Sequence, residues 1–232
     1  MKKLMYLGLG LAMLNLTSCK KGENDPGMSL KGRKGRIAGT WNMKTSSETS
    51  TRTQDGETRT ELNVSTDGAT FTNTNTDSEG TVSISNGNMT QKITFEKDGT
   101  FSLEMVRTTT GGSYDGTAYT IDAADQTTYT YKMSGNWAFL GKNKSAEYKN
   151  KERVALTSTS SESISSDSDE NEWNSVWTST GDQDVDMVMV LDMLKSKELG
   201  MKSSSTSTDT PNSSDNTPTT RSNDEESTWE KE

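Results

Sequence analysis

Residues 93–105 read Ile93-Thr94-Phe95-Glu96-Lys97-Asp98-Gly99-Thr100-Phe101-Ser102-Leu103-Glu104-Met105, with apolar and polar side chains alternating on both sides of Lys97-Asp98-Gly99. Alternation with a period of two is typical of a strand that buries one face. A two-residue loop would place each phenylalanine opposite a polar residue. A three-residue loop instead pairs Phe95 with Phe101 and Ile93 with Leu103, which keeps one face apolar. The sequence therefore predicts an antiparallel hairpin whose loop ends with Gly99 in the left-handed conformation.

The same alternation recurs along much of the chain, where β-branched threonine is the commonest filler. Apolar residues make up 28% of the sequence, so the core is expected to be thin. The alternating apolar positions outside the hairpin are Tyr129, Tyr131 and Met133, Trp137 and Phe139, Val154 and Leu156, and Val185, Met187, Met189, Leu191 and Met193. Together they predict an all-β fold, an antiparallel barrel of roughly eight to ten strands.

Turns divide the predicted strands from one another. Asp67-Gly68 and Asn86-Gly87 are expected to form turns, and Lys195-Ser196-Lys197 is expected to close a later hairpin. Residues 110–127 show no clear alternation and are expected to form a loose segment. Trp173 and Val176 are assigned to a further strand.

The N-terminus has the three parts of a secretory signal: the basic Lys2 and Lys3, an apolar run from Leu4 to Leu14, and a small-residue cleavage site. The apolar run is shorter than the ~20 residues that a membrane-spanning helix needs. The following Leu16-Thr17-Ser18-Cys19 resembles the lipobox of bacterial lipoproteins, which implies that Cys19 is lipidated after cleavage. The alternative is an ordinary signal peptide with a chance cysteine.

These features divide the chain into four parts. We expect a signal peptide at 1–18, a lipidated flexible tether at 19–36, a barrel domain at 37–202, and a low-complexity, mostly disordered tail at 203–232, where almost nothing apolar is left to bury. The tether is basic. Its charges could attract anionic headgroups or form a solvated linker, and the sequence leaves both interpretations open.

The composition excludes several kinds of chemistry. The chain has no histidine and a single cysteine, Cys19, so the usual catalytic dyads, disulfides and zinc sites have no residues to form them. A net charge of −9 argues against nucleic acid as a partner. Asp182-x-Asp184-x-Asp186 opens like a calcium loop but has Met187 where glycine is required and Met193 where glutamate is required. We therefore expect no metal, no cofactor and no enzymatic activity.

The order of motifs carries a family resemblance. The lipobox, the basic segment up to Arg36, Gly39-Thr40-Trp41 at the first strand and Phe95-x-Lys-Asp-Gly-Thr-Phe101 together resemble the lipocalin-like lipoproteins of Bacteroidetes. The resemblance covers 1–43 and 88–105 well and 129–203 loosely. It implies a barrel in which Gly39 allows a sharp turn into the first strand and Trp41 closes the base. It implies no activity, because function resides in sites rather than folds.

Three functions remain open from the sequence. The favoured one is a non-catalytic cell-envelope lipoprotein, anchored through acylated Cys19 and most consistent with the outer membrane, that binds a small apolar or amphipathic ligand in its barrel. The second is a surface interaction, adhesion or structural module with a filled barrel and a protein partner that the sequence does not identify. The third is a carboxylate-dependent hydrolase, which would need two acids close together in one cleft. The expected ligand-lining residues are Trp41, Phe95, Phe101, Tyr131, Trp137, Met187 and Met189.

Overall fold

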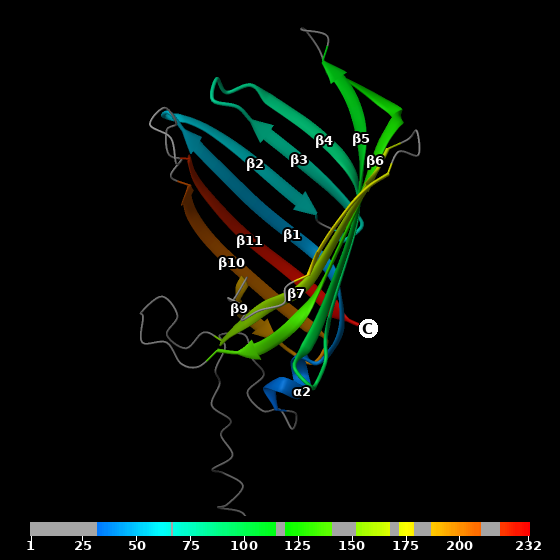
Figure 1. The fold of residues 1–232 in the computed structure, drawn as a ribbon, viewed down its shortest axis with the longest axis vertical. Helices are drawn as coiled ribbons and strands as arrows, with labels where there is room; N and C mark the ends of the chain where they lie inside the picture. Colours follow the sequence, from blue (N-terminus) through cyan, green and yellow to red (C-terminus); the bar gives the residue numbers. More distant parts are fainter. Residues whose placement is uncertain are drawn as a thin grey trace, which may run out of the picture.

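The computed structural model describes the backbone of residues 32–65, 67–114, 119–140, 152–167, 172–178, 187–209 and 219–232, and the side chains of these residues except 111–125, Trp177 and Asp209. The predicted all-β fold is confirmed (Figure 1). The elements are α2 (Arg33–Ile37), β1 (Gly39–Gln54), β2 (Glu57–Ser65), β3 (Thr70–Thr76), β4 (Val82–Phe95), β5 (Thr100–Tyr114), β6 (Tyr119–Phe139), β7 (Glu152–Ser166), β8 (Glu172–Thr178), β9 (Met187–Leu194), β10 (Glu198–Asp209) and β11 (Thr219–Lys231).

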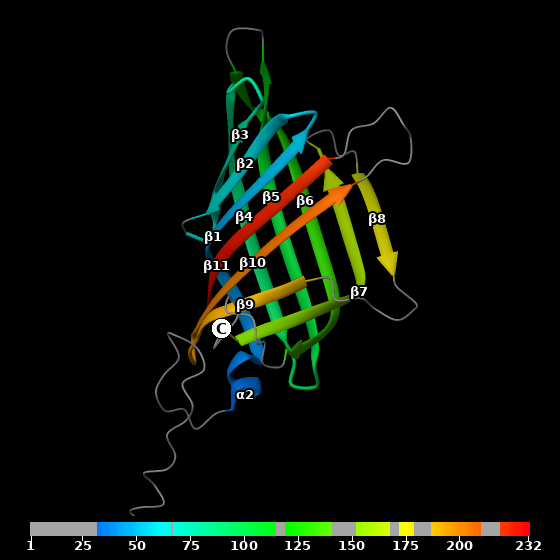
Figure 2. The ribbon, with the colours of Figure 1, turned by 90° about the vertical axis from the view of Figure 1, so that its left-hand side faces the viewer.

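The strands form a closed antiparallel barrel of ten strands, in the order β6-β5-β4-β3-β2-β1-β11-β10-β9-β7, with β6 pairing back onto β7. Figure 2 shows β9 crossing the lower part of the barrel and β8 beside the upper part of β7. Strand β7 pairs with β9 over Glu152–Leu156 and with β8 over Ser160–Ser166. The short strands β8 and β9 therefore occupy successive parts of the same edge of β7.

The barrel is narrower at the end that carries α2. There Gly39–Asn42 of β1 pairs directly with Lys92–Phe95 of β4, so the ring at this level consists of the eight strands β1, β11, β10, β9, β7, β6, β5 and β4. Above this level the β2–β3 hairpin lies between β1 and β4 and widens the ring. We call the eight-stranded end the base and the rest the upper barrel.

The predicted hairpin at residues 93–105 is confirmed. Phe95 pairs with Phe101 and Ile93 pairs with Leu103. The Glu96 amide donates to the Thr100 carbonyl at 2.8 Å, which leaves a three-residue loop, and Gly99 has φ +105°. The turns at Asp67-Gly68 and Lys195–Lys197 are also confirmed. Further along the chain, Trp137 and Phe139 pair with Leu156 and Val154.

The base is a packed apolar core. Its buried cluster comprises Ile37, Trp41, Met43, Ile93, Phe95, Phe101, Met133, Trp137, Val154, Leu156, Met189, Leu191, Leu194, Leu199, Met201 and Trp229. Three buried indoles each find a hydrogen-bond acceptor: Trp41 Nε1 donates to the Ile37 carbonyl at 2.7 Å, Trp137 Nε1 to the Glu96 carbonyl at 3.0 Å, and Trp229 Nε1 to Ser227 Oγ at 2.9 Å. The core therefore gains large apolar area without the cost of an unpaired N–H group.

Helix α2 closes the base from below. Arg33 forms an ion pair with the buried Glu152 at 2.6 Å, and Arg36 donates to the Leu194 carbonyl at 2.8 Å. Lys231 of the last strand donates to the Arg36 carbonyl at 2.9 Å and also to the Ala38 carbonyl. Gly39, at the start of β1, has φ +125°, a backbone conformation that favours glycine. The expectation of a flexible tether up to residue 36 is therefore wrong at its end, because Arg33–Ile37 is helical and Ile37 is fully buried.

The expectation of a mostly disordered tail at 203–232 is wrong for residues 203–209 and 219–231, which form strands, while residues 210–218 lie outside the described residues. Strand β10 continues to Asp209, and β11 pairs with β1 on one side and β10 on the other. The tail folds because Trp229 inserts into the base core and is 3% exposed. The remaining positions of β11 are polar, but a polar strand between two others keeps its backbone hydrogen bonds and needs little apolar area. The barrel domain therefore extends from Gly39 to Lys231.

Two local expectations from the sequence are wrong. Residues 110–114 and 119–127 belong to β5 and β6 rather than to a loose segment. Asn86-Gly87 lies inside β4, and the turn before this strand is formed by Asp77 to Gly80. A Cβ atom at Gly87 would lie 2.0 Å from the Thr108 carbonyl oxygen and 2.7 Å from the Phe71 ring. Close packing, and not a turn, requires glycine there.

Candidate functional site

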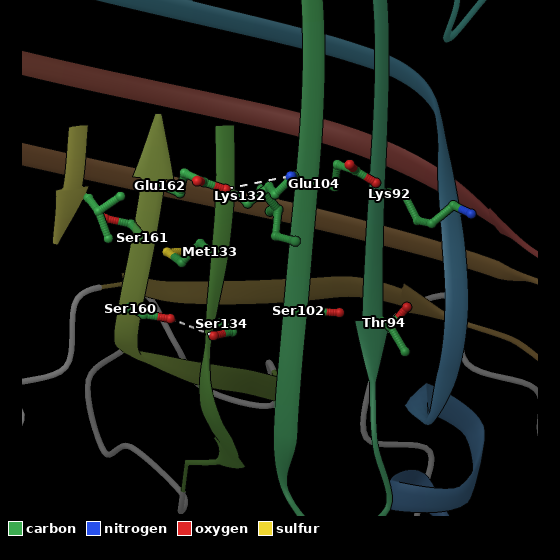
Figure 3. Close-up of a pocket in the computed structure, with 12 residues that line it drawn as sticks. Lys92, Thr94, Ser102, Glu104, Lys132, Met133, Ser134, Ser160, Ser161 and Glu162 are labelled. Carbon is green, nitrogen blue, oxygen red and sulfur yellow. Dashed lines mark hydrogen bonds and ion pairs between the residues drawn. The ribbon is translucent and has the colours of Figure 1, made fainter. Parts of the chain in front are cut away.

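The outer wall of the barrel carries a shallow groove of about 460 Å³ across β4, β5, β6 and β7 (Figure 3). Several of its polar side chains already have partners. Lys132 lies 3.5 Å from Glu162, Ser134 and Ser160 share a hydrogen bond of 2.8 Å, and Lys92 lies 3.1 Å from Glu232. An open groove of this kind offers a ligand little desolvated surface. We therefore regard it as an ordinary solvated face of the sheet.

The barrel interior contains a chamber of about 360 Å³ directly above the base core. This volume lies within the range of small-molecule sites. Residues from eight strands line it: Ser46, Glu48, Asn63, Val64, Phe71, Met89, Gln91, Leu103, Met105, Arg107, Tyr131, Met133, Met187, Asn223 and Glu225. The chamber is the candidate site, because side chains from β1 to β6, β9 and β11 converge on it.

Four of the eight apolar side chains that line the chamber are methionines. Met89, Met105, Met133 and Met187 all border the chamber, and Met133 belongs to the base core. Methionine side chains are flexible and polarizable, so they adapt to the shape of an apolar ligand. The chamber therefore has a soft apolar floor that continues into the base.

The seven expected lining residues fall into two groups. Tyr131 and Met187 border the chamber. Trp41, Phe95, Phe101, Trp137 and Met189 are buried in the core below it, with exposed fractions of 5% or less. The structure thus brings all seven to the barrel interior but places only the first two at the cavity surface.

One wall of the chamber is rich in hydrogen-bond acceptors. Glu48 of β1 and Glu225 of β11 are direct partners in the β1–β11 ladder, so their side chains stand side by side on the inner face. Burial and the neighbouring Glu48 raise the pKa of Glu225, and a hydrogen bond from Ser203 opposes the rise. Asn223 lies two positions before Glu225, and its buried Oδ1 has no hydrogen-bond donor among the described residues.

Arg107 of β5 stands across the chamber from this wall. In the ten-stranded ring, five steps separate β5 from β11, which is half of the circumference. The guanidinium lies 4.0 Å above the centre of the Phe71 ring, a cation–π contact that orients it. Its buried Nε has no acceptor among the described residues. Burial lowers the pKa of Arg107, and the charges of Glu61 and Glu48 oppose that change.

Further up the wall, the polar residues follow strict layers. The register pairs Ser46 with Ser65 and Ser227, Glu48 with Asn63 and Glu225, Ser50 with Glu61 and Asn223, and Arg52 with Arg59 and Arg221. Alternation along the strand places these layers on the same face as Glu48. Asn63 and Asn73 connect Glu48 to Glu61 by hydrogen bonds. The inner face thus changes from apolar at the base, through carboxylates, to arginines at the wide end.

Two kinds of chemistry considered from the sequence can be compared with this geometry. Among the described residues, no three acidic, cysteine or histidine side chains gather closely enough to hold a metal ion. Glu48 and Glu225 are two acids in one cavity, which is the arrangement that a carboxylate-dependent hydrolase would need. They stand on neighbouring strands of the same wall.

Four polar residues of the chamber were not expected from the sequence: Arg107, Glu48, Glu225 and Asn223. The expected lining consisted of apolar and aromatic residues alone. A signal was present: in β1 threonine occupies Thr49, Thr51 and Thr53, and a charged or polar residue occupies each position between them. Period-two alternation of this kind marks a two-faced strand even when neither face is apolar.

Comparison with known proteins identifies no relative. No protein-family model, no curated protein sequence and no solved structure matches the chain. Within the part of the chain that the structure describes, no helix has the length and apolar character needed to cross a bilayer.

Proposed function

We propose that the protein is a non-catalytic, lipid-anchored protein of the cell envelope that binds a small amphipathic ligand in the chamber of its barrel. The observation that carries this proposal is the chamber itself, which is lined by eight strands and lies between an apolar floor and a polar wall. A ligand with an apolar tail would place the tail against the methionines and its polar end against Glu48, Glu225 and Arg107. A purely apolar ligand would leave these charged groups without partners, which is costly.

The proposed anchor is the acylated Cys19, which lies outside the described residues. Helix α2, the first element that the structure describes, packs against the base. An anchor that precedes it would hold the barrel by its packed end and leave the upper barrel pointing away from the membrane. Two or three acyl chains on one residue supply stable attachment where a single chain does not.

Ligand binding is tested with the purified protein by native mass spectrometry and lipid extraction, followed by titration with amphiphiles. A Met89→Trp substitution should fill the chamber and abolish binding, because Met89 borders it. A matched Ser102→Trp substitution in the outer groove should leave binding unchanged. If both variants retain the ligand, or if no amphiphile binds to the intact barrel, the proposal is wrong and an interaction module becomes the better interpretation.

The anchor is tested by replacing Cys19 with serine. The variant should move from the membrane fraction to the soluble fraction while its thermal unfolding stays the same. Residual electrostatic binding by the basic segment should disappear at high salt, because salt screens surface charge. A variant that still sediments with membranes at high salt would exclude the lipid as the sole anchor.

A further inference from the structure

We propose that the polar end of the ligand carries both charges: an anionic group that pairs with Arg107 and a primary ammonium that pairs with Glu48 and Glu225. This inference rests on the proposed function, because it specifies the class of ligand for the same chamber. It would make the protein a receptor for zwitterionic amphiphiles.

Arg107 is the group that would bind the anionic part of the ligand. Its guanidinium borders the chamber, and the Phe71 ring fixes it in position at 4.0 Å. Burial lowers the pKa of Arg107, and the charges of Glu61 and Glu48 only oppose that change. The buried Nε hydrogen also has no acceptor among the described residues. A carboxylate or phosphate is the partner that a guanidinium binds best, through two parallel hydrogen bonds.

The facing wall, with Glu48, Glu225 and Asn223, would bind the ammonium group. Glu48 and Glu225 are direct neighbours across the β1–β11 ladder, where like charges destabilise a sheet. The pKa of Glu225 is raised by burial first and by this repulsion second. The unpaired Oδ1 of Asn223 adds an acceptor next to the pair. A primary ammonium has three donors and a positive charge, so it would satisfy both carboxylates and the amide oxygen.

The separation of the two walls explains why one ligand would need both groups. Arg107 and Glu225 come from strands half of the ring apart, so each is held on its own rigid wall. An anionic ligand without an amine would face the repulsion of Glu48 and Glu225. A cationic ligand without an acid would face Arg107. A head group with both charges compensates the two walls at once and leaves its tail free for the methionine floor.

The test uses four probes with the same tail and different heads: α-aminooctanoate, octanoate, octylamine and octanol, titrated into the full protein by calorimetry at neutral pH. We expect α-aminooctanoate to bind at least about tenfold more tightly than octanoate or octylamine, which corresponds to about 1.4 kcal/mol. Octanol measures binding by the tail alone. If α-aminooctanoate binds no more tightly than octanol, or if octanoate or octylamine is the tightest probe, the inference is overturned.

Charge-removing variants sharpen the test. Arg107→Met should make octylamine the tightest probe, and the double variant Glu48→Gln with Glu225→Gln should make octanoate the tightest. An unchanged order of preference in either variant contradicts the inference. Octanol should still bind to both variants, which shows that the chamber remains intact. If the wild-type protein binds none of the four probes, the proposed function fails together with the inference, whereas binding without a preference for the zwitterion refutes the inference alone.

Discussion

The base and the upper barrel are formed largely by the same strands, but they use opposite kinds of side chain on the inner face. In the base, β1 contributes the buried Trp41 and Met43, and β11 contributes the buried Trp229. A few residues further along, the same two strands present Glu48 and Glu225 to the chamber. The change occurs where the β2–β3 hairpin enters the ring and widens it.

This difference indicates that the base and the upper barrel have different roles. An eight-stranded ring is just narrow enough for side chains to fill it, so the base can pack solidly. The wider ring above leaves space that side chains do not fill, and polar groups there are exposed to solvent or to a ligand. The base should therefore supply most of the stability, and the upper barrel should tolerate change while determining what binds.

The largest loss of stability is expected from Trp41→Ala in the base. Trp41 is fully buried, and its indole N–H is hydrogen-bonded to the Ile37 carbonyl. Removing a buried tryptophan leaves a cavity and should lower the free energy of unfolding by about 3–5 kcal/mol, as measured by urea denaturation. The control is Trp173→Ala on β8, where the side chain is 58% exposed and a change of less than about 0.5 kcal/mol is expected. Equal losses in both variants would contradict the expectation that the base supplies most of the stability.

A smaller loss is expected at the edge of the base, from Arg33→Met. The substitution removes the ion-pair partner of Glu152, whose side chain is 4% exposed. A buried carboxylate without a partner should lower the free energy of unfolding by about 1–3 kcal/mol. Adding Glu152→Gln should restore part of the loss, which a double-mutant cycle measures. If the two losses simply add, the ion pair makes no net contribution.

Glu225→Gln in the upper barrel should change stability in the opposite direction. Because burial and Glu48 raise the pKa of Glu225, the folded protein binds a proton more tightly than the unfolded chain does. The resulting stabilisation is complete below the ordinary pKa of 4.5 and is lost as the pH rises through the raised value. At neutral pH the variant should therefore be more stable than the wild type, by on the order of 1 kcal/mol.

The pH profile identifies the cause of that gain. Unfolding measured at several pH values should show the advantage of Glu225→Gln shrinking as the pH falls, and disappearing below pH 4.5. Glu104→Gln on the outer wall serves as the control and should track the wild type throughout. A constant advantage at every pH would point to packing rather than to the charge of Glu225.

The smallest effect is expected from Lys132→Met in the outer groove. The ion pair with Glu162 is 3.5 Å long, and the Lys132 side chain is 49% exposed. Exposed pairs of this kind contribute less than about 1 kcal/mol. The difference from the wild type should vanish in high salt, which screens exposed charges. A loss as large as that of Arg33→Met would show that the outer wall, and not only the base, stabilises the barrel.

The registers of the strands with alternating apolar residues could be predicted from the sequence. The register of the hairpin at residues 93–105 follows from keeping Phe95 opposite Phe101, and the strand partners of Trp137 and Phe139 follow from the same rule. Apolar residues at alternate positions leave few acceptable registers, because a slip by one residue would turn them toward solvent.

The polar inner face of the upper barrel could not be predicted in the same way. In β2, β3 and the upper parts of β10 and β11, both faces are polar, so the pattern does not specify which face points inward. The positions of Glu225 and Asn223 depend on β11, which joins the barrel through Trp229 and two long ladders rather than through a run of apolar residues. Arg107 enters the chamber because β5 continues inside the ring beyond the apolar hairpin.

The pairing of β1 with β11 determines when the barrel can close. Thr45 and Thr228 share a hydrogen bond across a separation of 183 positions in the chain. Contacts this distant in sequence form late, because the entropy of closing the loop must be offset before they contribute, and folds dominated by them reach the native state slowly. Until β11 docks, β1 and β10 each present an open edge that another chain can pair with. During folding, closure of the ring therefore competes with edge-to-edge association between chains. The fraction of chains that associate depends on the protein concentration.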